Sequence, residues 1–268
     1  MTIDATGTRS PSNLRLRMIA SVAMIAVATG ALVGGGIALW LLAVVVAIVM
    51  MGEWADLEKA PPRAKRIAQF ALSVSLAVMA PASLILETRD FFTLGLIAGG
   101  AFFVAIVTRR QQLALGVVYC ALPVLALVFV RRQDHGLLFA FWMLSIVWAC
   151  DIGAFFAGRA IGGAKLAPRL SPNKTWAGLG GGVVAATALA LLLHRYEGLP
   201  WRLTLATPLL AVLAQGGDLY ESWLKRRAGV KDSGTILPGH GGVLDRLDGF
   251  VPVAPVAALL VVVPYLYR

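Results

Sequence analysis

Residues 222–248 read SWLKRRAGVKDSGTILPGHGGVLDRLD, a long polar segment in a strongly apolar chain. The segment holds three aspartates, five basic residues, one histidine and five glycines. Apolar segments precede and follow it, which is typical of a polar segment held between membrane helices. Carboxylates bind divalent cations, while basic side chains and glycine-rich backbone bind phosphates. The stretch therefore predicts a site for phosphates and a metal ion at the edge of a membrane.

The composition supports a membrane protein. Of the 268 residues, 59% are hydrophobic and 14% are charged, whereas about a quarter of the residues in soluble domains are charged. The net charge of +10 first suggests a nucleic-acid partner. However, the basic residues lie in short loops between apolar segments, a pattern typical of cytoplasmic loops in membrane proteins. We therefore expect no nucleic acid among the partners.

The apolar segments predict an all-α polytopic integral membrane protein with about nine transmembrane helices, because one crossing takes about 20 residues. The expected helices cover 16–51 (two helices in a tight hairpin, broken at Gly34–Gly36), 67–86 with a kink at Pro81, 91–108, 113–130, 137–156, 177–193, 203–219 and 250–267. Segment 53–66 is expected to be a charged loop. The helix at 203–219 is expected to be interrupted at residues 215–218.

The basic residues also predict an orientation. With nine crossings and the N-terminus in the cytoplasm, most of the 24 Lys and Arg residues fall in cytoplasmic segments, as the positive-inside rule requires. This places the polar loops 158–176 and 221–248 on the cytoplasmic side, where nucleotides are. The chain then divides into a disordered tail (1–15), N-terminal transmembrane helices (16–135) and a C-terminal catalytic transmembrane region (136–268).

Three aspartates are candidate metal ligands. Asp218 lies at the end of an apolar segment, where a carboxylate is costly and by default functional. Asp245 and Asp248 are three residues apart at the start of the last helix, so both can face one site. Such oxygen ligands suit Mg²⁺, which takes one or two carboxylates together with substrate phosphates. The alternative is that these carboxylates only form ion pairs with neighbouring Lys and Arg residues.

The spacing around Asp218 adds further candidates. If the helix continues past residue 219, Glu221, Ser222 and Lys225 share one face with Asp218. Upstream, Asp151 opens the run DIGAFFAGR, where it is expected to bind metal, orient a nucleotide or pair with Arg159.

A glycine-rich turn, 237–242, is a candidate anion site, because successive backbone N–H groups in such turns bind phosphate. Lys231 and Arg246 flank the turn and strengthen that interpretation. Within it, His240 is expected to orient a phosphate or transfer a proton, or else only to form a hydrogen bond within the loop.

A second basic cluster, SPNKT at 171–175, precedes the helix expected at 177–193. A lysine and a hydroxyl group at a helix N-terminus favour phosphate binding. The alternative is that Thr175 is the N-cap and that Lys174 extends along the membrane surface toward water.

At these residues the chain resembles the bacterial phosphatidate cytidylyltransferases, or CDP-diacylglycerol synthases. The fixed positions of the signature of that family match Ser222, Lys225-Arg226, Lys231-Asp232, Pro238, His240-Gly241-Gly242, Asp245-Arg246 and Asp248. The resemblance is strong over about 145–250 and weaker before it, although Glu53-Trp54 is also similar to the family. It implies that CTP and phosphatidic acid give CDP-diacylglycerol and pyrophosphate in phospholipid biosynthesis. It further implies Mg²⁺, a second cation such as K⁺, and a homodimer in the bacterial inner membrane with the active site facing the cytoplasm.

The resemblance also implies residue roles. The catalytic residues are Asp218, Lys225, Asp245 and Asp248, of which the three aspartates bind metal. The residues implied to bind substrate are Lys174, Ser222, Arg226, Lys231, His240 and Arg246. The chain departs from the family pattern at Gly163, Ala177 and Gly249, which affects auxiliary contacts only.

Two other classes of function remain open from the residues. One is a related CTP-dependent lipid enzyme, such as a polyprenol kinase or a synthase acting on archaeal ether lipids. The other is a transporter with a polar re-entrant loop, although no internal repeat of the kind typical of transporters is seen. Membrane lipids surround the protein in either case.

Overall fold

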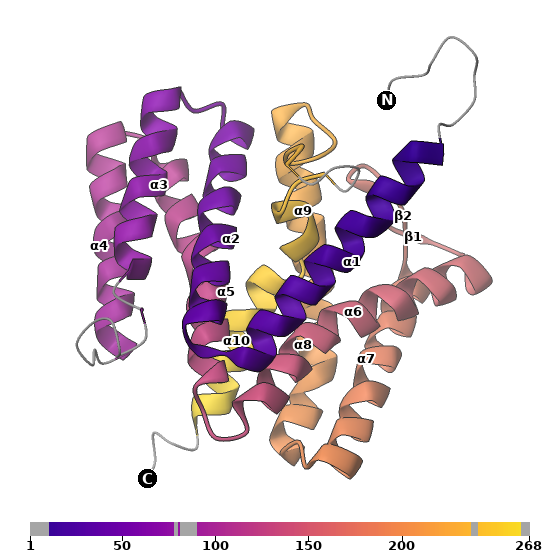
Figure 1. The fold of residues 1–268 in the computed structure, drawn as a ribbon. Helices are drawn as coiled ribbons and strands as arrows, with labels where there is room; N and C mark the ends of the chain where they lie inside the picture. Colours follow the sequence, from indigo (N-terminus) through magenta and orange to yellow (C-terminus); the bar gives the residue numbers. More distant parts are fainter. Residues whose placement is uncertain (1–10, 78–79, 81–89, 237–240, 264–268) are drawn as a thin grey trace.

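The computed structural model of the chain describes residues 11–77, 80, 90–236 and 241–263. The α-helices are α1 Pro11–Gly34, α2 Gly36–Leu57, α3 Pro62–Ala77, α4 Asp90–Thr108, α5 Gln111–Arg131, α6 Gly136–Ile161, α7 Trp176–Glu197, α8 Trp201–Ala228, α9 Leu244–Leu247 and α10 Phe250–Val262. Two strands, β1 Lys165–Ala167 and β2 Ser171–Thr175, lie between α6 and α7 (Figure 1). Residues 1–10 of the tail expected at 1–15, the kink at Pro81 and the end of the last helix lie outside the described residues. Residues 11–15 belong to α1, so that part of the tail prediction is wrong.

The helices have the composition of membrane segments. By length and hydropathy, four described helices are able to cross a membrane: α2, α5, α6 and α7. Shorter apolar helical segments cover 22–34, 92–108 and 250–262. A helix suits a bilayer because it satisfies its own backbone hydrogen bonds. The chain is thus a helical membrane protein with one small β-hairpin.

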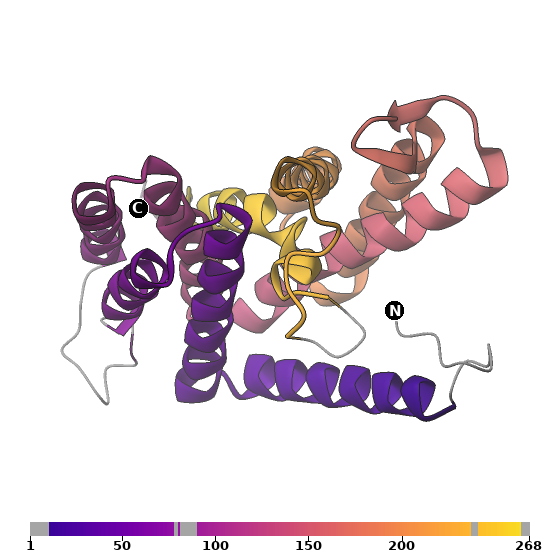
Figure 2. The same cartoon turned by 90° about the horizontal axis from the view of Figure 1, so that it is seen from above.

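The first two helices meet where the glycines predict a break. Gly35 and Gly36 adopt φ angles of 61° and 52°, which glycine reaches at little cost. The expected tight hairpin is wrong, however. Both views show α1 running away from α2 at a wide angle instead of packing along it (Figures 1 and 2).

Helix α8 is continuous, which corrects the expected interruption at 215–218. Its two glycines lower helix propensity by about 1 kcal/mol each, but packing explains one of them. A Cβ atom at Gly217 would lie 2.4 Å from the carbonyl oxygen of Asp248. Glycine therefore lets the segment that leads into α10 approach α8 next to Asp218.

The three segments expected to be loops, 53–66, 158–176 and 221–248, are partly ordered into regular structure; in the last of them, α8 continues to Ala228. Helix α6 continues to Ile161, and an antiparallel hairpin then pairs Lys165 with Thr175 and Ala167 with Ser171. In the segment 53–66, α2 extends to Leu57 and α3 begins at Pro62, a residue well suited to the first helical position. Only four residues connect α2 and α3, and Glu53 belongs to α2.

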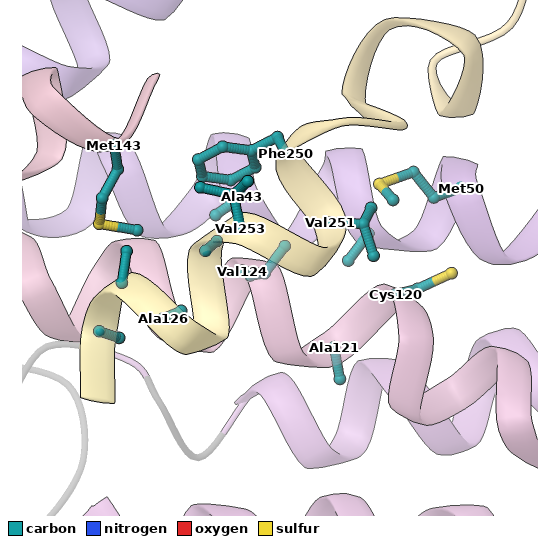
Figure 3. Packing of buried hydrophobic residues seen from close by; sticks show 14 of the residues in the cluster. Ala43, Met50, Cys120, Ala121, Val124, Ala126, Met143, Phe250, Val251 and Val253 are labelled. Atoms are coloured by element: carbon teal, nitrogen blue, oxygen red, sulfur yellow. The ribbon is translucent and has the colours of Figure 1, made fainter. Parts of the chain in front are cut away.

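The buried core joins the N-terminal helices to the C-terminal ones. Figure 3 shows Met50 of α2 and Val124 of α5 beside Phe250 and Val251 of α10. An apolar pocket of about 150 Å³ borders this core, and its lining includes Leu32, Val124, Leu247 and Phe250. The polar segment before α10 is thus attached to a rigid apolar support.

Candidate functional site

The candidate site lies where α8, β2 and α9 meet, near the end of the molecule that is uppermost in Figure 1. Because α8 is continuous, Asp218, Ser222 and Lys225 lie on one face of it. The Ser222 hydroxyl is 3.4 Å from Oδ1 of Asp218. The conditional prediction of a shared helix face is therefore confirmed.

One polar network joins β2 to α8 and α6. The Lys174 ammonium group forms an ion pair with Asp218 and donates a hydrogen bond of 2.9 Å to Oε1 of Gln215. The Gln215 amide donates to Oδ1 of Asp151 over 3.2 Å. The structure thus brings Lys174 into the same site as Asp218, as the sequence predicts, and joins both to Asp151 through Gln215.

A second network centres on Asp245. Its Oδ1 accepts a hydrogen bond of 2.7 Å from Lys225 Nζ. Its Oδ2 accepts from the backbone N–H of Ser233 at 2.9 Å and of Gly242 at 2.8 Å, and lies 3.0 Å from the Ser233 hydroxyl. Burial acts to raise the pKa of Asp245, but the hydrogen bonds from Lys225, Gly242 and Ser233 outweigh it and lower the pKa below its ordinary value. Asp245 is thus an ionised and firmly held carboxylate.

Two further carboxylates lie close by in less favourable surroundings. Asp248 is largely buried and faces Asp218, so burial and this neighbouring negative charge raise its pKa to about 7. Glu221 is fully buried, and neither of its carboxylate oxygens accepts a hydrogen bond, although Lys225 Nζ lies 3.4 Å from Oε1. Carboxyl groups therefore outnumber the described ammonium groups in this region, which favours the protonated form of Asp248.

The predicted substrate-binding residues are only partly gathered. Arg226, Lys231 and Arg246 are exposed near the networks. His240 and most of the glycine-rich turn lie outside the described residues. The N–H of Gly242 is donated to Asp245, so it does not act as a free phosphate donor.

Thr175 proves to be a helix cap. Its hydroxyl oxygen accepts a hydrogen bond of 3.0 Å from the backbone N–H of Gly178 at the start of α7. The alternative interpretation from the sequence is therefore correct for Thr175, while Lys174 next to it belongs to the site.

We expect Thr175→Ala to lower the free energy of unfolding by about 1 kcal/mol, the usual contribution of an N-cap, and to leave the KM for the expected nucleotide substrate unchanged. Denaturant titration and steady-state kinetics measure the two effects. Thr187→Ala is the matched control, because its hydroxyl donates to the Val183 carbonyl within α7 and caps nothing. A rise in KM without loss of stability would instead assign Thr175 to substrate binding.

Sequence reasoning missed three residues of the site: Glu53, Gln215 and Ser233. Glu53 was assigned to a loop, and Gln215 to a break in a helix. Ser233 lies within the polar stretch and carries no charge to mark it. Each is a buried polar residue, and burial of these side chains is visible only in the tertiary structure.

Comparisons with known proteins find relatives over most of the chain. Residues 15–263 match the sequence model of a family described as the cytidylyltransferase family. A phosphatidate cytidylyltransferase of Brucella suis biovar 1 (strain 1330) is 36% identical over 250 residues, covering 91% of this chain and 91% of that protein. The phosphatidate cytidylyltransferase of Bacillus subtilis (strain 168) is 44% identical over 147 residues, covering 53% of this chain and 55% of its own length.

Proposed function

Because the chain belongs to the cytidylyltransferase family, we propose that it transfers CMP from CTP to phosphatidic acid, giving CDP-diacylglycerol and pyrophosphate for phospholipid biosynthesis. One observation supports this proposal. The ion pairs Lys174–Asp218 and Lys225–Asp245 lie along the same face of α8, because Asp218 and Lys225 both belong to that face. This arrangement places ammonium groups and carboxylates together along the C-terminal part of α8. Family relatives with high coverage are phosphatidate cytidylyltransferases.

The reaction suits these residues. A phosphate oxygen of phosphatidic acid attacks the α-phosphorus of CTP, and the bond from that phosphorus to the pyrophosphate oxygen breaks. The attacking oxygen is already anionic, so no strong base is required. The barrier comes from bringing two anions together and from charge that develops on pyrophosphate, both of which fixed cations lower. Lys174 and Lys225 are held in place by carboxylates and supply such charges.

In this proposal the predicted substrate-binding residues also contact the phosphates, in addition to the two lysines. Arg226, Lys231 and Arg246 bind phosphate oxygens, and Ser222 and His240 donate hydrogen bonds to them.

The donor set also fits Mg²⁺, held by Asp218 and Asp245 with support from Asp248. The supporting observation is geometric: in the part of the chain that the structure describes, the carboxyl groups of Asp218, Asp245 and Glu221 contact only two ammonium groups, those of Lys174 and Lys225. Among the described residues, no three His, Cys, Asp or Glu side chains are grouped closely enough to hold a metal ion alone. Substrate phosphates therefore complete the ligand set in this proposal, as is common for Mg²⁺. When bound, the ion neutralises phosphate charge; a second cation such as K⁺ adds to this.

We place the enzyme in the bacterial inner membrane with nine crossings, as a homodimer whose site faces the cytoplasm. The charge distribution supports this orientation. Large exposed apolar side chains on α6 and α7, such as Ile152, Phe155 and Val184, suit contact with lipid or with a second subunit. The lipid tails then stay in the bilayer while the head group reaches the polar site.

An acceptor panel tests the proposal against its alternatives. Purified protein, CTP and Mg²⁺ are mixed separately with phosphatidic acid, a polyprenol and an archaeal ether-lipid phosphate, and the lipid products are separated. We expect a CDP-lipid from phosphatidic acid at the highest rate. A phosphorylated polyprenol would show a kinase, preference for the ether lipid would show the related synthase, and no nucleotide chemistry would favour a transporter.

A further inference from the structure

Glu53 is a buried carboxylate that lies near the end of α2, far from the polar stretch in sequence. It is 2% exposed. Asp56 and Glu58, on the same segment, form ion pairs with Lys65 and Arg227. Among the described residues, no Lys or Arg forms an ion pair with Glu53. A buried charge requires compensation, and here the polar stretch supplies it.

The compensation comes from the segment that leads into α9. Oε1 of Glu53 accepts a hydrogen bond of 2.9 Å from the N–H of Val243, and Oε2 accepts one of 2.8 Å from the N–H of Leu244. Val243 is the N-cap residue of α9 and Leu244 is its first residue, and N–H groups at a helix start have no partner within the helix. Glu53 therefore acts as a cap for α9 that is supplied by another helix.

Two glycines fit closely around the same carboxylate. A Cβ atom at Gly234 would lie 2.7 Å from Oε1 of Glu53, and one at Gly242 would lie 2.6 Å from Oε2. Any side chain at either position would displace the carboxylate or the loop. Both ends of the segment 234–242 thus pack directly on Glu53.

Ser233 connects Glu53 to Asp245. Its hydroxyl oxygen lies 3.0 Å from Oε2 of Glu53 and 3.0 Å from Oδ2 of Asp245. The side chain is buried and carries a single proton, so it donates to one carboxylate at a time. A change at Glu53 therefore alters the hydrogen bonding of Asp245.

We propose that Glu53 is a positioning residue that fixes residues 233–234 and 242–244 and, through Ser233, orients Asp245 for nucleotidyl transfer. The inference rests on the proposed function for its kinetic consequence only. The effect on the segment itself is independent of the reaction.

The first test is Glu53→Gln, which keeps the size of the side chain and replaces one acceptor oxygen by an NH₂ donor. We expect kcat to fall about 10- to 100-fold, the usual effect of losing a partner of an active-site ligand. We also expect faster hydrogen–deuterium exchange at the N–H groups of Val243 and Leu244 without any ligand. Asp56→Asn is the matched control, with the same charge change on α2, and is expected to match the wild type in both measurements.

Ser233→Ala keeps the inference testable if Glu53→Gln does not fold. Ser233→Ala should lower kcat several-fold. Where both single variants fold, the decrease in kcat of the double variant should be smaller than the product of the two single decreases, because both residues act on Asp245 through the same hydrogen bonds. Wild-type kcat in Ser233→Ala, or a Glu53→Gln variant that only lowers thermal stability, would overturn the inference. If the wild type forms no CDP-lipid, the proposed function fails, while unchanged exchange in Glu53→Gln would refute the positioning role.

Discussion

Asp245→Asn is expected to leave the protein folded, because Lys225 keeps Glu221 as an ion-pair partner. It is expected to lower CDP-diacylglycerol formation by at least about 10²- to 10³-fold, the scale of losing one preorganised electrostatic group. The asparagine keeps the shape of the side chain and one oxygen that accepts from Ser233 and Gly242. It removes the negative charge that faces Lys225 and that is proposed to hold Mg²⁺. Turnover at saturating Mg²⁺ measures the loss, and the thermal unfolding midpoint checks the fold.

Asp134→Asn is the control for this prediction, because Asp134 is an exposed residue in the connection between α5 and α6. It should retain wild-type turnover. Wild-type turnover in Asp245→Asn at saturating Mg²⁺ would refute the assignment of Asp245 as a metal ligand.

The second large effect is expected for Lys225→Met. Lys225 Nζ lies 2.7 Å from Oδ1 of Asp245 and 3.4 Å from Oε1 of the fully buried Glu221. Without the ammonium group, two neighbouring carboxylates lose their cation in a region that is already short of positive charge. Breaking a buried ion pair in this way typically costs about 3–5 kcal/mol. We therefore expect a large loss of folding free energy together with loss of turnover.

Chemical denaturation of the detergent-solubilised protein measures that free energy. Arg226→Met is the stability control, because the adjacent Arg226 is exposed and forms no ion pair with a buried carboxylate in the described part of the chain. A Lys225→Met variant as stable as the wild type would show that the buried carboxylates are neutral and need no cation.

Much of the helical pattern is predictable, because long apolar segments leave few alternatives in a membrane. The continuity of α8 was not predictable, because two consecutive glycines normally indicate a break in a helix. Only the close approach of Asp248 to Gly217 gives such a glycine its packing role. The divergence of α1 from α2 likewise depends on packing that no local pattern contains.

In the site, too, some groupings follow from local sequence and others depend on tertiary packing. Spacing along one helix was enough to group Asp218, Ser222 and Lys225. Glu53 could not be placed, because its role depends on contacts with residues about 190 positions later in the chain. The ion pairs of Asp218 and Asp245 that the sequence left open are present, and their binding of metal stays a prediction.

Two isotope labels on CTP test whether the protein transfers CMP to phosphatidic acid. Purified protein receives Mg²⁺, phosphatidic acid and CTP labelled at the α-phosphate in one reaction and at the γ-phosphate in another. We expect the α-label to enter the lipid and the γ-label to be released as pyrophosphate. A γ-label found in the lipid, or neither label transferred, would contradict it.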